Sequence, residues 1–311
     1  MTALAMVLAL ALEAALGWPD AVYRRIGHPV TWIGALIARL ERALNHGGPM
    51  ARRLSGLVLV ALVCALCGGV GWALQAVLPG GWPGVALTAL LAAPFMAGRS
   101  LYVHVAAVAA PLQAGDVDGA RGAVAMIVGR DPAALDAPGI ARAALESLGE
   151  NASDGVVAPL FWGVLGGLPG LILYKGINTM DSMIGYRDAR YEDFGKPAAR
   201  LDDLANWLPA RLTALGFALV SGRPRHVLGL AWAEAGQHRS PNAGWPEAAL
   251  AGALGCRLSG PRVYGDRREA HPWVNGGCPD PDAATLRAGL GVFVRMTVLV
   301  AAALLLAGAL A

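Results

Sequence analysis

The sequence predicts an all-α fold, that of a polytopic integral membrane protein with a polar helical portion on the cytoplasmic side. Hydrophobic residues make up 56% of the 311 residues and the mean hydropathy is +0.50, which is too apolar for an ordinary soluble protein. Long runs of Ala, Leu and Val carry no charge. The short connector 20–53 holds six arginines against Asp20 and Glu41, an excess that is typical of the cytoplasmic face.

Apolar segments predict where the chain crosses the bilayer. Four spans are expected, at about 3–16, 54–78, 85–110 and 290–310, and two further segments, 156–174 and 204–220, either span or re-enter. Because a charge at mid-membrane costs about 3 kcal/mol on insertion scales, the third span is expected to leave the bilayer near Arg99. No basic residue precedes the first span, so we expect it to be retained rather than cleaved as a secretory signal.

The segment 156–174 decides the topology of the polar residues around it. Pro159, Gly166, Gly167 and Pro169 interrupt it. If it crosses fully, the polar clusters before and after it lie on opposite sides of the membrane. We favour a re-entrant hairpin that turns near Gly166-Gly167 and keeps both clusters on one side, since broken helices are tolerated where they are buried in protein.

The rest of the chain sets limits on function. The segments 113–155 and 175–289 are expected to form the polar portion of a single domain covering 1–311. The net charge of +3 comes from scattered arginines, which argues against a nucleic-acid partner. The four cysteines give no disulfide framework. There is no P-loop, no Rossmann fingerprint and no H-E-x-x-H or G-x-S-x-G, so a bound nucleotide would need an acidic, metal-bridged site.

An acidic helix face precedes the interrupted segment. Glu146, Glu150 and Asp154 are four residues apart, with Asn151 beside them, and like charges at this spacing repel one another. Mg²⁺ bound to nucleotide phosphates would explain them, because Mg²⁺ takes one or two carboxylates together with phosphate oxygens. The alternative is a solvated helix face.

A second polar cluster follows the interrupted segment. Asn178, Asp181 and Ser182 are predicted to share a helix face, with Lys175 one turn earlier. Lysine can follow phosphate charge, and an aspartate can hold metal or accept a proton. Further charged residues follow it in the chain: Asp188, Arg190 and the pair Asp202-Asp203. The alternative is an internal salt-bridge network.

A third motif, from Arg239 to Glu247, predicts a turn that opens a helix at Pro246. Arg239, Ser240 and the free N–H groups of such a turn could hold an anion. The alternative is a simple helix start.

Several motifs together resemble one family. They are Gly27-His28-Pro29-Val30, Gly129-Arg130-Asp131, Glu146-Ser147 with Glu150-Asn151 and Asp154-Gly155, Asn178-Thr179-x-Asp181-Ser182-Met183-x-Gly185-Tyr186, and Ser240-Pro241-Asn242-Ala243-Gly244. In this order they are similar to the CobD/CbiB family of cobalamin biosynthesis, the adenosylcobinamide-phosphate synthases. One departure is Gly17-Trp18-Pro19-Asp20, which stands where the family pattern is expected to read Gly-Asp-Pro, so a role for Asp20 does not carry over.

The resemblance implies a multi-pass enzyme of the bacterial inner membrane with its active site facing the cytoplasm. Such enzymes are ATP-dependent ligases that join adenosylcobyric acid to (R)-1-amino-2-propanol or its O-phosphate. The lipid bilayer is an expected partner, and a homo-oligomer or a complex with other late cobalamin-pathway membrane enzymes stays open.

The expected cofactors are ATP and Mg²⁺, with roles assigned to residues of this chain as hypotheses. Expected metal ligands are Glu146, Glu150, Asp154 and Asp181. Expected catalytic residues are Lys175 on phosphate and Asp181 or Asp188 as proton acceptor for the amine. Expected binding residues are Asn151, Asn178, Thr179, Ser182, Arg190, Arg239, Ser240 and Asn242, with Arg239 or Arg190 on the aminopropanol phosphate.

Two other classes compete with the enzyme. A non-catalytic membrane sensor or regulator of the AmpE type would not need the three polar motifs together. A corrinoid transporter would need more uninterrupted spans than this sequence predicts.

Overall fold

The computed structural model describes residues 1–129, 132–264, 267–269 and 271–310, and it is 78% helical. The chain forms two compact units. Unit 1 comprises Met1–Ala97, Ala158–Asn206 and the chain from Leu304, and unit 2 comprises Gly98–Val157 and Trp207–Ala303. Each unit is therefore built from segments that are far apart in the sequence.

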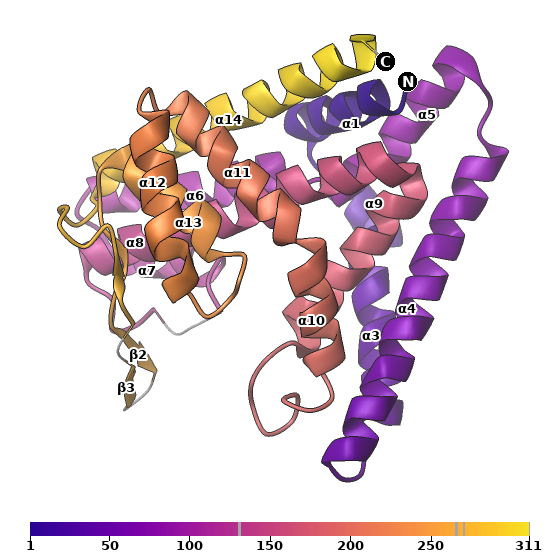
Figure 1. Cartoon of the computed structure of the whole chain (residues 1–311), viewed down its shortest axis with the longest axis horizontal. Coiled ribbons are helices and arrows are strands. Elements are labelled where there is room, and N and C mark those ends of the chain that lie inside the picture. Colours follow the sequence, from indigo (N-terminus) through magenta and orange to yellow (C-terminus); the bar gives the residue numbers. More distant parts are fainter. Residues whose placement is uncertain (130–131, 265–266, 270, 311) are drawn as a thin grey trace. The chain divides into compact units, whose positions relative to one another are not determined.

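Unit 1 is a helical bundle in which α4 packs along α9 (Figure 1). Its helices are α1 (Thr2–Leu16), α2 (Asp20–Ile26), α3 (Pro29–Leu44), α4 (Pro49–Val77), α5 (Gly81–Ala92), α9 (Ala158–Ile184) and α10 (Lys196–Ala205), with a 3₁₀ turn at Ala93–Phe95. The start of α3 explains the Gly27-His28-Pro29-Val30 motif. His28 Nδ1 accepts a hydrogen bond from Val30 N at 3.2 Å, and Pro29 occupies the first turn, where its missing N–H costs nothing.

Helix α9 reverses direction at Gly167, whose backbone has φ 60° and ψ −149°. A Cβ on Gly163 would lie 3.7 Å from Leu171 Cβ, whereas eight residues of straight helix would separate such atoms by about 12 Å. Gln75 of α4 holds the turn, because its Oε1 accepts a hydrogen bond from Leu168 N at 2.9 Å. The chain therefore bends sharply inside the region where the turn was predicted, and re-entry into the membrane stays a prediction.

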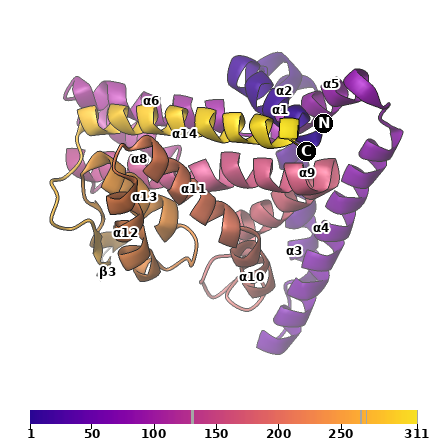
Figure 2. The same cartoon turned by 45° about the horizontal axis from the view of Figure 1, so that its top comes forward.

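Unit 2 contains a cluster of three helices, α11, α12 and α13, that pack against one another (Figure 2). Its elements are α6 (Gly98–Gln113), α7 (Val117–Ala125), α8 (Ala137–Ala152), a π-helical turn (Ser153–Val157), α11 (Trp207–Val220), α12 (Pro224–Glu234), a 3₁₀ turn (Ala235–Gln237), α13 (Gly244–Leu254) and most of α14 (Ala283–Leu310).

Four short strands modify the all-α prediction. They are β1 (Leu258–Ser259), β2 (Arg262–Tyr264), β3 (Arg267–Glu269) and β4 (Trp273–Val274), which pair antiparallel as β1–β4 and β2–β3. Leu258 lies opposite Val274 in the first pair. The fold is mostly helical with almost no strands, in agreement with the all-α prediction, and these four strands lie between α13 and α14.

Four helical stretches of the described chain are long and apolar enough to cross a membrane: Pro49–Val77, Gly81–Gln113, Ala137–Ile184 and Ala283–Leu310. They include the spans predicted at 54–78, 85–110 and 290–310. The second stretch, Gly81–Gln113, is interrupted by the 3₁₀ turn Ala93–Phe95, which contains Pro94. These stretches give the protein the character of a multi-pass membrane protein.

The predicted first span is too short by itself. Helix α1 has 15 residues, a rise of about 22 Å against a hydrocarbon core of about 30 Å. It reaches spanning length only together with Asp20–Leu44, across a bend of 104°. The segment 204–220 forms α11, a shorter apolar helix of 14 residues. Arg130 and Asp131 of the Gly129-Arg130-Asp131 motif lie outside the described residues.

Candidate active site

The predicted site residues fall into two groups, one in each unit. Unit 1 holds Lys175, Asn178, Thr179, Asp181, Ser182, Asp188 and Arg190. Unit 2 holds Glu146, Glu150, Asn151, Asp154, Arg239, Ser240 and Asn242.

The polar face of α9 follows its reversal at Gly167. Two of its hydroxyls bond to the helix backbone: Thr179 Oγ1 donates to Lys175 O at 2.6 Å, and Ser182 Oγ donates to Asn178 O at 2.9 Å. Thr179 is buried and Ser182 is exposed. With their protons committed to the helix, both hydroxyls retain only acceptor capacity toward a ligand.

Gly185 leaves room for the carboxylate of Asp181. A Cβ at position 185 would lie 2.0 Å from Asp181 Oδ1, so a larger residue there would displace that carboxylate. This contact gives the glycine of the Asn178–Tyr186 motif a physical reason: it lets the helix end close against the side chain of Asp181.

Three carboxylates meet between α9 and α10. Burial, together with the charge of Asp181, raises the pKa of Asp202 to about 7, although hydrogen bonds from Asn206 and Asn178 act in the opposite sense. Burial also raises the pKa of Asp203, against the pull of Arg200 and Arg187. This cluster of Asp181, Asp202 and Asp203 is called the α9–α10 carboxylate cluster below.

A buried chain of hydrogen bonds holds Asp202 in place. Tyr174 Oη donates to Asn206 Oδ1 at 2.9 Å, and Asn206 Nδ2 donates to Asp202 Oδ2 at 3.0 Å. All three residues are buried. Although Asn178 lies near enough to affect its titration, Oδ1 of Asp202 makes no hydrogen bond of normal geometry within the described residues. Asp202 is the functional candidate that our sequence reasoning left without a role, and its signal was an Asp-Asp pair on a short helix with an apolar face.

Asp188 and Arg190 are engaged in local and long-range structure. Asp188 Oδ1 accepts hydrogen bonds from Arg190 N at 2.8 Å and Tyr191 N at 2.9 Å, and so stabilises a turn. Arg190 forms a two-point ion pair with Glu41 of α3. Both contacts correspond to the structural alternative that we weighed for these residues, and neither excludes a ligand.

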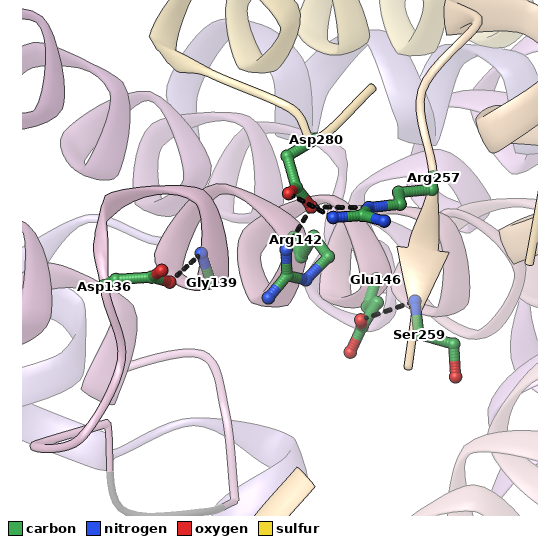
Figure 3. A network of polar contacts seen from close by, with 7 residues as sticks. All are labelled: Asp136, Gly139, Arg142, Glu146, Arg257, Ser259 and Asp280. Carbon is green, nitrogen blue, oxygen red and sulfur yellow. Dashed lines mark hydrogen bonds and ion pairs between the residues drawn. The ribbon is translucent and has the colours of Figure 1, made fainter. Parts of the chain in front are cut away.

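In unit 2 the acidic residues precede and enter the π-helical turn. Glu146 and Glu150 lie on α8, one turn apart, but Asp154 lies in the π turn, whose extra residue changes its direction from that of a continuous α-helix. Glu146 Oε1 accepts a hydrogen bond from Ser259 N at 3.0 Å and so anchors β1 (Figure 3). Asn151 is exposed, and its Nδ2 donates to Ser147 O at 2.9 Å.

Asp280 joins α8 to the chain after α13. It pairs with Arg257 through two contacts, Nε–Oδ1 at 2.9 Å and Nη2–Oδ2 at 2.6 Å, and also with Arg142 (Figure 3). The Arg257 and Arg142 guanidinium groups hold the pKa of Asp280 below its usual range. Both arginines also stack on Trp273, with guanidinium-to-ring distances of 4.3 Å for Arg257 and 5.1 Å for Arg142.

The loop before α13 orients its polar groups inward. Ser240 Oγ accepts hydrogen bonds from Asn242 N and Ala243 N, each at 3.2 Å, as at a helix start. Asn242 is buried, and its Oδ1 accepts a hydrogen bond from Arg211 Nη1 at 3.3 Å. Arg239 is exposed. The predicted turn and helix start are present, and the predicted role in anion binding stays a prediction.

No group of three or more His, Cys, Asp or Glu side chains that could hold a metal ion occurs within the described parts of the chain. Mg²⁺ bound to a nucleotide needs only one or two protein carboxylates, with phosphate and water supplying the remaining oxygens. The α9–α10 carboxylate cluster offers donors of that type. The predicted metal ligands stay predictions.

The chain is similar to proteins of one family along nearly its whole length. The family model described as "CobD/Cbib protein" matches residues 6–293, which include every predicted site residue. A protein of Rhodobacter capsulatus named "Cobalamin biosynthesis protein CobD" is 60% identical over 290 residues, which cover 93% of this chain and 92% of that protein. Proteins of the same name from Brucella suis and Sinorhizobium fredii are 46% and 44% identical, covering 92% and 96% of this chain and 90% and 95% of their own lengths. No solved structure matches the chain.

Proposed function

The chain belongs to the CobD/CbiB family and is an enzyme of cobalamin biosynthesis, and on that premise we propose that it is an ATP-dependent amide ligase. The proposed reaction joins a propionate of adenosylcobyric acid to (R)-1-amino-2-propanol or its O-phosphate, giving adenosylcobinamide or its phosphate. The proposed site faces the cytoplasm of the bacterial inner membrane.

The chemistry of an amide ligase sets the demands on the site. A carboxylate is a poor electrophile, so ATP must first convert it to an acyl phosphate, which the amine then attacks with loss of inorganic phosphate. The first step needs cations where phosphoryl charge develops, and the second needs a proton acceptor for the amine. When bound, Mg²⁺ would neutralise phosphate charge.

The observation that carries the proposal is the α9–α10 carboxylate cluster. Asp181, near the end of the helix α9 that also bears Lys175, and Asp203 of α10 supply oxygens of the kind that Mg²⁺ prefers. Lys175 would contact phosphate. Asp202, with a pKa of about 7, is suited to hold a proton released by the amine at neutral pH.

The test uses detergent-solubilised protein with adenosylcobyric acid, aminopropanol phosphate and Mg-ATP. We expect a corrinoid product heavier by the aminopropanol phosphate, formed only with ATP, together with ATP hydrolysis. Asp181→Asn should lower the rate by about 100-fold or more. Asp118→Asn is the matched control, because Asp118 is 91% exposed and pairs only with the neighbouring helix position Arg121.

A second outcome would favour the regulator class. Binding of the corrinoid without a new product, in a folded preparation, would contradict the ligase and support a non-catalytic sensor of the AmpE type. Full activity of Asp181→Asn would refute the role of the carboxylate cluster while leaving the ligase reaction itself in place.

A further inference from the structure

A large apolar pocket lies inside unit 1, away from the α9–α10 carboxylate cluster. Its volume is about 740 Å³, within the size range of about 300–1,000 Å³ seen for ligand sites. It lies where the chain bends by 104° between α1 and the helices that follow. Side chains of α1, α2, α3, α4, α5 and α9 line it, among them Leu16, Trp18, Trp32, Val70, Leu91 and Ile172.

Two indole rings contribute to the apolar lining. Trp18 Nε1 donates to Gly27 O at 3.1 Å, and Trp32 Nε1 donates to Ile26 O at 2.8 Å. These bonds satisfy both indole N–H groups and also two carbonyls at the end of α2. The rings therefore offer carbon surface to the pocket, and a polar ligand would find few partners there.

Part of the pocket lining belongs to a helix of membrane character. Helix α4 is one of the stretches apolar enough to span the bilayer. Leu66 and Val70 of α4 line the pocket and are also 51% and 44% exposed. Leu62, one turn before Leu66, is 49% exposed and continues this aliphatic surface. An occupant can therefore enter sideways from the hydrocarbon region.

Net positive charge borders the pocket at α2, whose charged residues are Asp20, Arg24 and Arg25. Val22 lines the pocket, and Arg24 and Arg25 follow it on the same short helix. Both arginines are exposed, and neither has an ion-pair partner among the described residues. Arg25 lies three residues beyond Val22 and so on a neighbouring part of the same helix face.

We propose that this pocket binds one acyl chain of an anionic membrane phospholipid, whose head group pairs with Arg24 and Arg25. The occupant is a lipid because lining residues of α4 are also exposed on a helix that is apolar enough to span the bilayer, and because the lining offers few polar groups. The lipid is anionic because the charged groups that follow Val22 on α2 are both cationic.

The physics of the bilayer decides where selectivity comes from. A lipid tail is already in an environment as apolar as leucine, so moving it into the pocket gains little from the hydrophobic effect. The tail fills space that would otherwise leave the lining without contacts. Discrimination between lipids must then come from the head group and the two arginines.

The test offers equal amounts of palmitoyl-oleoyl phosphatidylglycerol and phosphatidylcholine to delipidated protein in detergent, with native mass spectrometry as the readout. We expect one phospholipid per chain and at least a five-fold preference for phosphatidylglycerol. This preference corresponds to a difference in binding free energy of about 1 kcal/mol. The double variant Arg24→Gln/Arg25→Gln should keep lipid but lose the preference.

Filling variants separate this pocket from the rest of the membrane surface. Val70→Trp, or Ala93→Trp if the first does not fold, should abolish retention of phosphatidylglycerol. Val298→Trp is the matched control, because Val298 lies on the spanning helix α14 and is 62% exposed. Equal retention by Val70→Trp and Val298→Trp would overturn the proposal, as would equal binding of both lipids by the wild type. A third outcome would also overturn the proposal: the wild type retains no lipid and is a dimer, and Val70→Trp is a monomer. The pocket would then bind a second copy of the chain.

Discussion

Arg190 and Glu41 lie 149 residues apart in the sequence and form a two-point ion pair, Nε to Oε1 at 3.0 Å and Nη2 to Oε2 at 2.9 Å. The side chain of Glu41 is 7% exposed and that of Arg190 is 61% exposed. The pair ties the turn after α9 to α3, within unit 1. Arg190, which the sequence suggests as a binding residue for phosphate, therefore has a structural partner in Glu41.

Replacing Arg190 tests that assignment. Arg190→Gln should lower the unfolding temperature in detergent, because it leaves the buried carboxylate of Glu41 without its cation. The double variant Glu41→Gln/Arg190→Gln should recover part of the loss. Unchanged stability together with a raised KM for aminopropanol phosphate would instead support a role for Arg190 in binding the substrate.

The titration of Asp202 predicts a pH dependence of stability. Its pKa is about 7 in the folded protein, against about 3.9 for an aspartate in an unfolded chain, so the folded state binds the proton more tightly than the unfolded state. The stabilising contribution of protonated Asp202 is therefore fully present below the unfolded pKa and is lost as the pH rises through the folded pKa of about 7. The free energy of unfolding falls by on the order of 2–4 kcal/mol over this range. Unfolding in mixed micelles from about pH 4 to about pH 8 measures this. Asp202→Asn should flatten the curve, and an unchanged slope in that variant would assign it to another group.

The buried hydrogen bond from Tyr174 to Asn206 predicts a loss of stability when its donor is removed. Tyr174→Phe removes the donor to Asn206 Oδ1 and leaves that oxygen buried without its partner, which should destabilise the protein by about 1–3 kcal/mol. Tyr23→Phe is the matched control, because Tyr23 is 52% exposed. Equal unfolding temperatures for the two variants would mean that water replaces the lost donor.

The reversal of α9 predicts opposite results at neighbouring glycines. Gly167→Ala should destabilise by about 2–3 kcal/mol, because the position has φ 60° and the new Cβ would displace Gln75 and its bond to Leu168. Gly166→Ala has nothing within 4 Å of the new Cβ and should be neutral or slightly stabilising. The comparison is read from thermal unfolding of both variants in one detergent. Equal effects would contradict the strained turn.

Glu146 allows a structural and a catalytic role to be separated. Glu146→Gln keeps an oxygen that accepts the hydrogen bond from Ser259 N, whereas Glu146→Ala loses it. If anchoring β1 is its main role, Glu146→Gln should retain most of the ligase rate and Glu146→Ala should lose unfolding temperature. A loss of rate in Glu146→Gln at normal stability, relieved by raised Mg²⁺, would restore the metal-ligand role.

Sequence reasoning succeeded where a pattern is local. The spans within α4 and α14 follow from uninterrupted apolar runs, and the turn at Gly167 follows from glycine pairs and prolines in an apolar segment. Glu146 and Glu150 lie one turn apart on α8 as predicted, whereas the π-helical turn at Asp154 could not be predicted, because helical periodicity assumes a constant number of residues per turn.

Long-range pairing could not be predicted from a single sequence. The partners of Asp280 lie 23 and 138 residues away, and no spacing rule connects such positions. The site residues of unit 1 were identified by type, but whether a charge meets a ligand or another side chain depends on tertiary packing. Asp202 illustrates this, since its pKa is raised by burial and by the charge of Asp181, both of which come from tertiary packing.

The sharp turn in α9 also bears on the number of membrane crossings, and so on which side of the membrane each loop faces. If the segment re-enters the membrane, as we predict, it contributes either no crossing or two, and its ends emerge into the same compartment. Insertions or deletions within Ala158–Ile184 can then alter packing without inverting the orientation of the flanking loops, whereas loss of a single straight span such as α4 would invert everything after it. On that prediction, the straight helices alone set which side of the membrane each loop faces.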